Sequence, residues 1–273
     1  MPVLATWNIN SVRLRLRLVL RFLRAYQPDV LCLQEIKCLN EQFPARQIAR
    51  AGWPHQAVHG QKGYHGVAIV SKFPLRDITS RVFAQIDHAR HVSAVIDMGR
   101  GPLTLHNFYI PAGGDLADPV LNDKFKHKMD FLGELKTWFA DAAFASNQII
   151  CGDFIIAPYE HDVWSHKQLL KVVSHTPVET AALEELLTGN HGWVDIVRKH
   201  VPMDQKLYTW WSYFAPDWQK ADKGRRLDHI WSTADVAQHC TGMEIVKAAR
   251  GWGKHPSDHV PVLVTFDPEA LAA

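Results

Sequence analysis

Polar side chains follow several apolar segments of this chain, at the points where a buried strand would end. The clearest stretch is residues 148–158, in which Ile149 and Ile150 lead through Gly152 to the carboxylate of Asp153. Comparable positions are held by Asn8, Glu35, Tyr109, Asp228, Asp258 and His259. Carboxylate and amide oxygens suit a hard divalent cation, and a histidine beside a carboxylate can orient or move a proton. Taken together, these groups predict metal-assisted hydrolysis of a phosphate ester.

Each of these residues also has an ordinary interpretation when it is taken alone. A Gly-Asp pair after a strand is more often a turn than a catalytic centre. Asn8 could be a turn residue, Glu35 a solvated strand end, and His259 a hydrogen-bonded core histidine. The functional interpretation therefore depends on whether the fold brings the whole set together.

The elements that must position these groups are predicted from the spacing of apolar residues. Strands are expected at residues 3–7, 29–35, 63–71, 91–97, 103–109, 227–231 and 262–266, and helices at 41–51, 123–143 and 180–187. A further helix is expected to begin after Ser11 as its N-cap. The expected core face of residues 123–143 consists of Phe125, Met129, Leu132, Leu135 and Phe139. Since strands outnumber helices, the pattern predicts an α/β protein with two packed sheets flanked by helices.

The composition is that of a globular protein without special features. The chain has 273 residues, 47% of them hydrophobic and 21% charged, with a net charge of only +2. The four cysteines have no zinc-finger or CxxC spacing, no apolar run is long enough to span a bilayer, and no signal peptide is expected. We therefore expect a single domain over residues 1–273, in a cytoplasmic, reduced protein with no membrane contact.

Seven short motifs give the chain a resemblance to a known family. They are TWNINSVR at residues 6–13, LQEIK at 33–37, GYHGVA at 63–68, NFYIP at 107–111, GDFIIAP at 152–158, RLD at 226–228 and SDHVP at 257–261. In this order they resemble the bacterial-type exonuclease III family of apurinic/apyrimidinic (AP) endonucleases, within the endonuclease/exonuclease/phosphatase superfamily. The resemblance implies a four-layer α/β sandwich with two mixed β-sheets packed face to face. It extends over nearly the whole chain.

The resemblance also implies roles for individual residues at the centre of the site. Glu35 would be the principal ligand of Mg²⁺ or Mn²⁺, with Asn8 beside it and Asp258 as a further candidate. Asp153 would orient or deprotonate the attacking water. His259 would hydrogen-bond the scissile phosphate, and Asp228 would hold its ring in orientation. Tyr109 would contact the phosphate or help to protonate the leaving group.

The implied substrate is duplex DNA that carries abasic sites or 3′ ends, and the implied state is a monomer. Trp210 and Leu227 match positions that form the walls of a pocket for the extrahelical baseless sugar. Such a pocket can select by shape, because a normal nucleotide carries a base that does not fit. Arg225 and Arg226 are expected to contact phosphates beside it.

One residue departs from the family motif at its centre. Where the family has Gly-Asp-Phe-Asn-Ile-Ala-Pro, this chain has Ile155 in place of the asparagine. Isoleucine offers neither donor nor acceptor, and losing one preorganised donor at a developing oxyanion costs about 10²–10³ in rate. We therefore expect a nuclease that folds and binds DNA but cleaves slowly. A compensating residue elsewhere is the alternative.

Two other functions are compatible with the sequence. The first is a phosphodiesterase of the same superfamily that acts on RNA or on a small phosphoester. The second is an AP-site-binding protein with little catalysis, because Ile155 has disabled the site. A panel of substrates separates the first from the leading hypothesis, and binding without turnover identifies the second.

Overall fold

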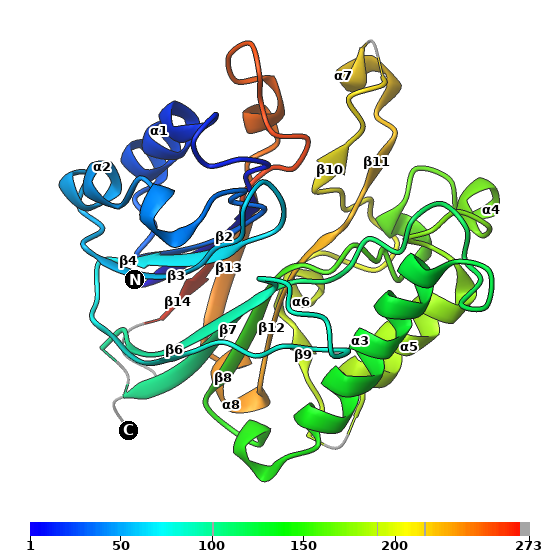
Figure 1. Ribbon diagram of the computed structural model, residues 1–273, viewed down its shortest axis with the longest axis horizontal. Helices are drawn as coiled ribbons and strands as arrows, with labels where there is room; N and C mark the ends of the chain where they lie inside the picture. Colours follow the sequence, from blue (N-terminus) through cyan, green and yellow to red (C-terminus); the bar gives the residue numbers. More distant parts are fainter. Residues whose placement is uncertain (100, 190, 216, 268–273) are drawn as a thin grey trace.

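Two six-stranded mixed sheets form the centre of the protein in the computed structural model, which describes residues 1–99, 101–189, 191–215 and 217–267 (Figure 1). The first sheet has the order β13 (Cys240–Ile245), β14 (Val262–Phe266), β1 (Val3–Asn8), β2 (Val30–Gln34), β4 (Val67–Ser71), β3 (His55–His59). The second has the order β5 (Leu75–Thr79), β6 (His91–Asp97), β7 (Pro102–Tyr109), β8 (Gln148–Asp153), β12 (Asp228–Ser232), β9 (Val194–Asp195). Each sheet has one parallel pair near its middle, β1 with β2 and β7 with β8.

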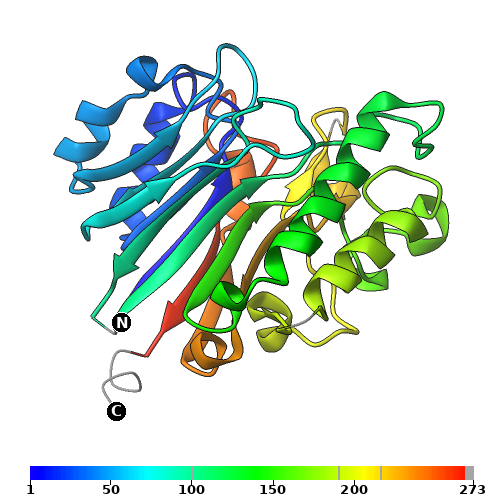
Figure 2. The ribbon, with the colours of Figure 1, turned by 60° about the horizontal axis from the view of Figure 1, so that its bottom comes forward.

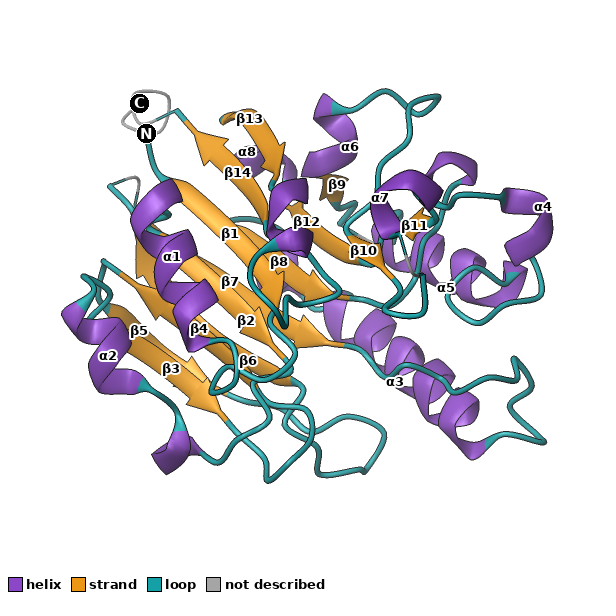
Figure 3. Cartoon of the chain, turned by 90° about the horizontal axis from the view of Figure 1, so that it is seen from above, coloured by secondary structure: helices purple, strands orange, loops and turns teal. Residues whose placement is uncertain are grey.

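Helices cover the outer face of each sheet, as Figures 2 and 3 show from two further directions. The first sheet is covered by α1 (Leu16–Tyr26) and α2 (Ala45–Arg50), and the second by α3 (Asp123–Phe139) and α5 (Pro177–Leu187). The shorter helices are α4 (His166–Leu169), α6 (Ile196–His200), α7 (Trp218–Ala221) and α8 (Ala234–Ala237). The 3-10 turns are Asn40–Gln42, Ala142–Phe144, Glu160–Asp162 and Lys247–Gly251. The expected four-layer α/β sandwich is therefore confirmed.

The strands are apolar on both faces because each sheet lies between two layers. Along β2, Cys32 points into the core between the sheets, whereas Leu31 and Leu33 pack with α1. Along β8, Cys151 points inward and Ile150 packs against α3 and α5. The alternation of neighbouring side chains between faces thus produces one hydrophobic core between the sheets and one on the outer face of each sheet.

Several boundaries differ from the expected ones. The helix expected after Ser11 begins at Leu16, because Ser11 has a left-handed φ of 86° and its amide donates to the Glu35 carbonyl. The third helix ends at Phe139, four residues before the expected end. The fifth begins at Pro177, after a capping box formed by Thr176 and Glu179.

A small hairpin stands above the edge where the parallel strands end. It consists of β10 (Trp210–Trp211) and β11 (Gly224–Arg225), with α7 at its tip, and it is drawn in yellow and gold in Figure 1. None of the helices within the described ranges is long and apolar enough to cross a membrane.

Candidate active site

Strand register brings three of the expected residues side by side in the second sheet. Tyr109 at the end of β7 pairs with Asp153 at the end of the parallel strand β8. Asp153 also pairs with Asp228 at the start of the antiparallel strand β12. In the first sheet, Asn8 at the end of β1 lies beside Gln34, the residue before Glu35. Because both parallel pairs end at the same edge of the sandwich, the polar ends of four strands meet there.

The amide of Asn8 joins the two sheets at this edge. Its Nδ2 donates to Glu35 Oε1 at 2.9 Å and to Asp153 Oδ2 at 2.8 Å, while its Oδ1 accepts from the Asn10 amide at 3.0 Å. Asn8 therefore presents N–H groups, and not its oxygen, to the carboxylates. The Asn8 oxygen accepts one hydrogen bond from the turn at Asn10, and its expected role as a metal ligand stays a prediction.

The chain leaves these strands through residues in the left-handed region. Glu35 has a φ of 49° after β2, and Ile155 has a φ of 52° after β8. Within β8, Gly152 has a φ of 135°, and a Cβ there would lie 2.0 Å from the Phe108 carbonyl oxygen. A branched side chain such as that of Ile155 is costly in this region, whereas asparagine tolerates it. Local strain of this kind is typical of functional sites.

His259 lies between two carboxylates. Its Nδ1 is 2.8 Å from Asp228 Oδ2, and its Nε2 is 3.5 Å from Asp153 Oδ2. Burial opposes the charged imidazole, but Asp228 and Asp153 outweigh it and raise the pKa of His259 to about 10. Burial and the neighbouring Asp228 raise the pKa of Asp153 to about 8, although His259 opposes this shift. The His259 ring, oriented by Asp228, is therefore a positively charged hydrogen-bond donor next to Asp153.

Glu35 is held by three neighbours. The Tyr109 hydroxyl donates to its Oε1 at 2.9 Å, and Lys37 Nζ lies 3.0 Å from its Oε2. Burial alone would raise the pKa of Glu35, but the charge of Lys37 and the hydrogen bond from Asn8 lower it. Lys37 also donates to Asn10 Oδ1 at 2.6 Å. Lys37 was missed in the sequence, although it stands two residues after Glu35 in the LQEIK motif.

A cavity of about 400 Å³ opens over these groups. Its walls include Glu35, Tyr109, Asp153, Ile155, Trp210, Arg225, Leu227, Asp258 and His259. Asp258 accepts hydrogen bonds from Trp210 Nε1 at 2.9 Å and Asn10 Nδ2 at 3.2 Å. The Arg225 guanidinium lies 5.3 Å from the centre of the Trp210 ring. Phe214, which lies beyond Trp210, has 96% of its surface exposed.

Arg226 does not reach this cavity, which corrects the expectation of a phosphate contact. Its side chain is completely buried and is paired with Asp195 at 2.5 Å and with Asp162 at 3.3 Å. Because its charge is already neutralised inside the protein, Arg226 cannot contact DNA without breaking this network. Of the two neighbouring arginines, only Arg225 lines the cavity.

The donor set fits a hard divalent cation. Glu35 and Asp153 present oxygens on either side of the Asn8 amide, which is the ligand chemistry that Mg²⁺ prefers. Burial and Asp228 raise the pKa of Asp153, a shift that a cation beside its carboxylate would oppose. Asp153, Asp228 and His259 also lie close enough to form a ligand cluster. However, His259 and Asp228 satisfy each other, so the oxygens of Glu35 and Asp153 are the better candidates.

Comparisons with known proteins agree with this geometry. The model of the Endonuclease/Exonuclease/phosphatase family matches residues 5–259. Exodeoxyribonuclease III of Haemophilus influenzae is 32% identical over 270 residues, which cover 96% of this chain and 98% of that protein. The structure of an AP endonuclease from Archaeoglobus fulgidus aligns with a TM-score of 0.88 at 31% identity and covers 98% of this chain and 100% of that one. The structure of a 3′ phosphatase from Neisseria bound to a product DNA hairpin aligns with a TM-score of 0.87 at 30% identity, and coverage is again 98% and 100%.

Proposed function

Because the chain belongs to the exonuclease III family of the endonuclease/exonuclease/phosphatase superfamily and is a nuclease, we propose that it hydrolyses the phosphodiester 5′ to abasic sites in duplex DNA. Cleavage there leaves a 3′-hydroxyl. The proposal includes 3′→5′ exonuclease and 3′-phosphatase activity at the same site, acting on 3′ ends. The similar 3′ phosphatase from Neisseria, whose structure holds a product DNA hairpin, supports this part.

The observation that carries the proposal is the single amide that holds two carboxylates from different sheets. Asn8 donates to both Glu35 and Asp153, and the Asp228–His259 pair approaches the same Asp153 oxygen from the other side. The result is a preorganised centre with a carboxylate for water, an imidazolium for phosphate and an oxygen donor set for a cation. Preorganised charge of this kind is usually the largest contribution to catalysis.

In the proposed reaction the residues of this chain have separate tasks. Asp153 orients the attacking water and accepts its proton, and His259 donates a hydrogen bond to the scissile phosphate. Glu35 holds a divalent cation, Mg²⁺ or Mn²⁺, which supplies charge neutralisation at the phosphate oxygens. Tyr109 donates a hydrogen bond to Glu35 in the free protein, and its hydroxyl is the candidate proton donor at the leaving group. Asn8 positions Glu35 and Asp153.

Selection of an abasic nucleotide is proposed for the apolar wall of the cavity. Trp210 and Leu227 leave space for a sugar without a base, and Arg225 stands beside Trp210 for a flanking phosphate. Phosphate contacts position the duplex without reading its sequence. This wall is also where the chain would distinguish DNA from a small phosphoester.

Ile155 is expected to slow the reaction. It lines the cavity next to Asp153, and its amide donates to Asp153 Oδ1 at 3.0 Å, but its side chain offers no hydrogen bond. Restoring asparagine adds a donor and an acceptor beside the water-orienting carboxylate. We expect Ile155→Asn to raise the cleavage rate about 10²–10³-fold in the presence of Mg²⁺ while DNA affinity changes little.

The test compares the natural chain with Ile155→Asn on duplex DNA that carries one abasic-site analogue. Cleavage and binding are followed in parallel at fixed salt, since affinity for DNA depends strongly on salt. Ile155→Val is the matched control, because it changes the side chain without adding a polar group. Equal rates for the natural chain and Ile155→Asn would refute the role given to this position. Inactivity of both on abasic and 3′-ended DNA would refute the substrate.

A second function is favoured by Ile155 itself. Tight binding of abasic DNA by the natural chain, with turnover only in Ile155→Asn, would identify a protein that recognises the lesion without processing it.

A further inference from the structure

A lysine is buried behind the active-site turn. Lys128 lies on α3, and none of its side chain is exposed. Its Nζ is 2.5 Å from Glu179 Oε1, donates to the Ile155 carbonyl at 3.0 Å, and is 3.4 Å from the Ala112 carbonyl. One ammonium group therefore contacts α5, the turn after Asp153 and the loop after Tyr109.

The partner carboxylate continues the connection to the neighbouring wall of the cavity. Glu179 accepts from the Ser174 amide at 3.1 Å with each of its oxygens, and its Oε2 accepts from the Thr176 hydroxyl at 2.5 Å. Ser174 lines the cavity, and its hydroxyl accepts from Arg225 at 2.8 Å. The Glu179 carboxylate thus fixes the segment that holds Arg225 beside Trp210.

Three left-handed residues surround this ion pair. Ile155 has a φ of 52°, Ser174 a φ of 90° and Gly113 a φ of 87°. A Cβ at Gly113 would lie 2.9 Å from Lys128 Cδ, so the loop passes directly against the lysine stem. Backbone in such conformations persists only where its surroundings hold it. For Ile155 and Ser174, the hydrogen bonds to Lys128 and Glu179 are part of that support.

We propose that Lys128 and Glu179 are positioning residues for hydrolysis, which fix two neighbouring walls of the cavity, residues 153–157 and 172–176, through one buried ion pair beside the direct hydrogen bond from the Ala157 amide to the Ser174 carbonyl. Neither residue is expected to touch the substrate. Lys128 holds the Ile155 carbonyl, and thereby the turn that aims Asp153, whichever side chain stands at position 155. The catalytic consequence rests on the proposed function, but the structural part does not.

A buried ion pair of this kind specifies conformation more than it adds stability. Burial lowers the pKa of Lys128, and the charge and hydrogen bond of Glu179 oppose that shift, so Glu179 offsets part of the cost of burying the lysine. Replacing a whole buried ion pair with apolar side chains is often neutral or stabilising, whereas removing one partner is strongly destabilising. Replacing Lys128 and Glu179 together therefore removes their hydrogen bonds to the two walls without leaving an unpaired buried charge, so that an effect on positioning can be measured apart from a loss of stability.

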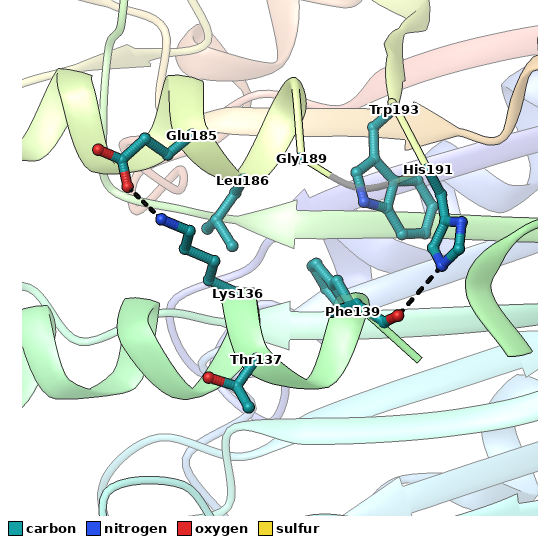
Figure 4. Close-up of a pocket in the computed structure, with 9 residues that line it drawn as sticks. Lys136, Thr137, Phe139, Glu185, Leu186, Gly189, His191 and Trp193 are labelled. Atoms are coloured by element: carbon teal, nitrogen blue, oxygen red, sulfur yellow. Dashed lines mark hydrogen bonds and ion pairs between the residues drawn. The ribbon is translucent and has the colours of Figure 1, made fainter. Parts of the chain in front are cut away.

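The test uses Lys128→Met and the double variant Lys128→Met/Glu179→Met. The matched control is Lys136→Met, because Lys136 and Glu185 form a second ion pair between α3 and α5, at 2.6 Å, with more than half of each side chain exposed (Figure 4). We expect the double variant to melt at a higher temperature than Lys128→Met. We also expect kcat on abasic DNA to fall roughly 10- to 100-fold in both, with a smaller change in KM, because a misplacement of about 1 Å has an effect of this size. The control should match the natural chain.

A second measurement does not depend on activity. Amide hydrogen exchange in residues 153–157 and 172–176 should become faster in the double variant, while β2 in the opposite sheet stays protected. If Lys128→Met does not fold, Glu179→Gln, which keeps the side-chain shape, is measured in the same way.

The outcomes distinguish this inference from the proposed function. If the double variant regains both stability and kcat, the pair is merely structural and the inference is wrong. If the natural chain and Ile155→Asn cleave no DNA, the proposed function is wrong, and exchange alone decides whether the pair holds the two walls. Unchanged exchange in both segments would overturn the inference even in an active enzyme.

Discussion

At the scale of single residues, the site depends on side chains in unusual backbone conformations. Ile155 combines a branched side chain with a φ of 52°, a pairing that the left-handed region disfavours by about 1–2 kcal/mol. The same residue is partly buried against the core between the sheets. The backbone strain at Ile155 lowers the stability of the protein, whereas the apolar contact raises it. A pair of variants can separate these two contributions.

We expect Ile155→Gly to be more stable than Ile155→Ala by about 1 kcal/mol, because both lose the same apolar contact and only glycine adopts a positive φ without strain. The measurement is the free energy of unfolding in urea. Val178 on α5 is the control position. Because alanine favours a helix and glycine does not, Val178→Ala should be more stable there than Val178→Gly. If the same one of the two residues, glycine or alanine, gave the more stable protein at both position 155 and position 178, the strain assigned to the backbone of Ile155 would be contradicted.

At the scale of elements, the cavity is supported by a charged network on its far side. Arg226 follows β11 and pairs with Asp195 of β9 and Asp162 of the turn Glu160–Asp162. Asp162 also pairs with Arg198 of α6 at 2.5 Å. This network fixes the strand that presents Leu227 and Asp228, so Arg226 serves the site through structure and not through DNA.

Replacing Arg226 with glutamine should therefore lower the free energy of unfolding by about 3–5 kcal/mol, because two carboxylates lose their buried partner. Thermal or urea unfolding checks this. Arg225→Gln is the comparison, since Arg225 lines the cavity and should affect DNA affinity more than stability. If Arg226→Gln keeps its stability but loses DNA affinity, Arg226 contacts a DNA phosphate, as the sequence led us to expect.

At the scale of the whole molecule, packing of the helix layer against the second sheet buries histidines in a neutral state, because His91 and His106 lie against Trp138 of α3. Burial lowers the pKa of His106 to about 4, against 6.5 for an exposed histidine, although the hydrogen bond that its ring donates to Gln148 Oε1 opposes the shift. His106 also lies 3.1 Å from His91, whose pKa is lowered well below its usual value by burial and by His106 itself. Between pH 4 and 6.5 the unfolded chain binds the proton that folded His106 does not.

Acid should therefore destabilise the protein through this histidine. The free energy of unfolding falls as pH drops from about 6.5 to about 4, with a contribution from His106 of about 1.4 kcal/mol per pH unit. In His106→Gln the slope across this window should be shallower by about that amount, whatever the variant's stability at pH 7. Urea unfolding at several pH values measures the slope, and an unchanged slope would contradict the assignment.

The sequence by itself determined the family, the sandwich of two sheets and the identity of most polar groups at the site. Seven motifs carry Glu35, Tyr109, Asp153, Asp228 and His259 at the ends of apolar segments, and local pattern suffices for that. The departure at Ile155 is also visible in the sequence alone.

Only the tertiary structure decided how these groups are used. Strand register placed Tyr109 and Asp228 on either side of Asp153, and the Asn8 amide joined Glu35 to Asp153 across the two sheets. Burial separated Arg226 from Arg225, and it enclosed Lys128 of α3 completely, next to Met129, which packs against the core as expected. Charged residues usually face solvent, so their burial becomes visible only when distant partners such as Asp195 and Glu179 are brought to them by the fold.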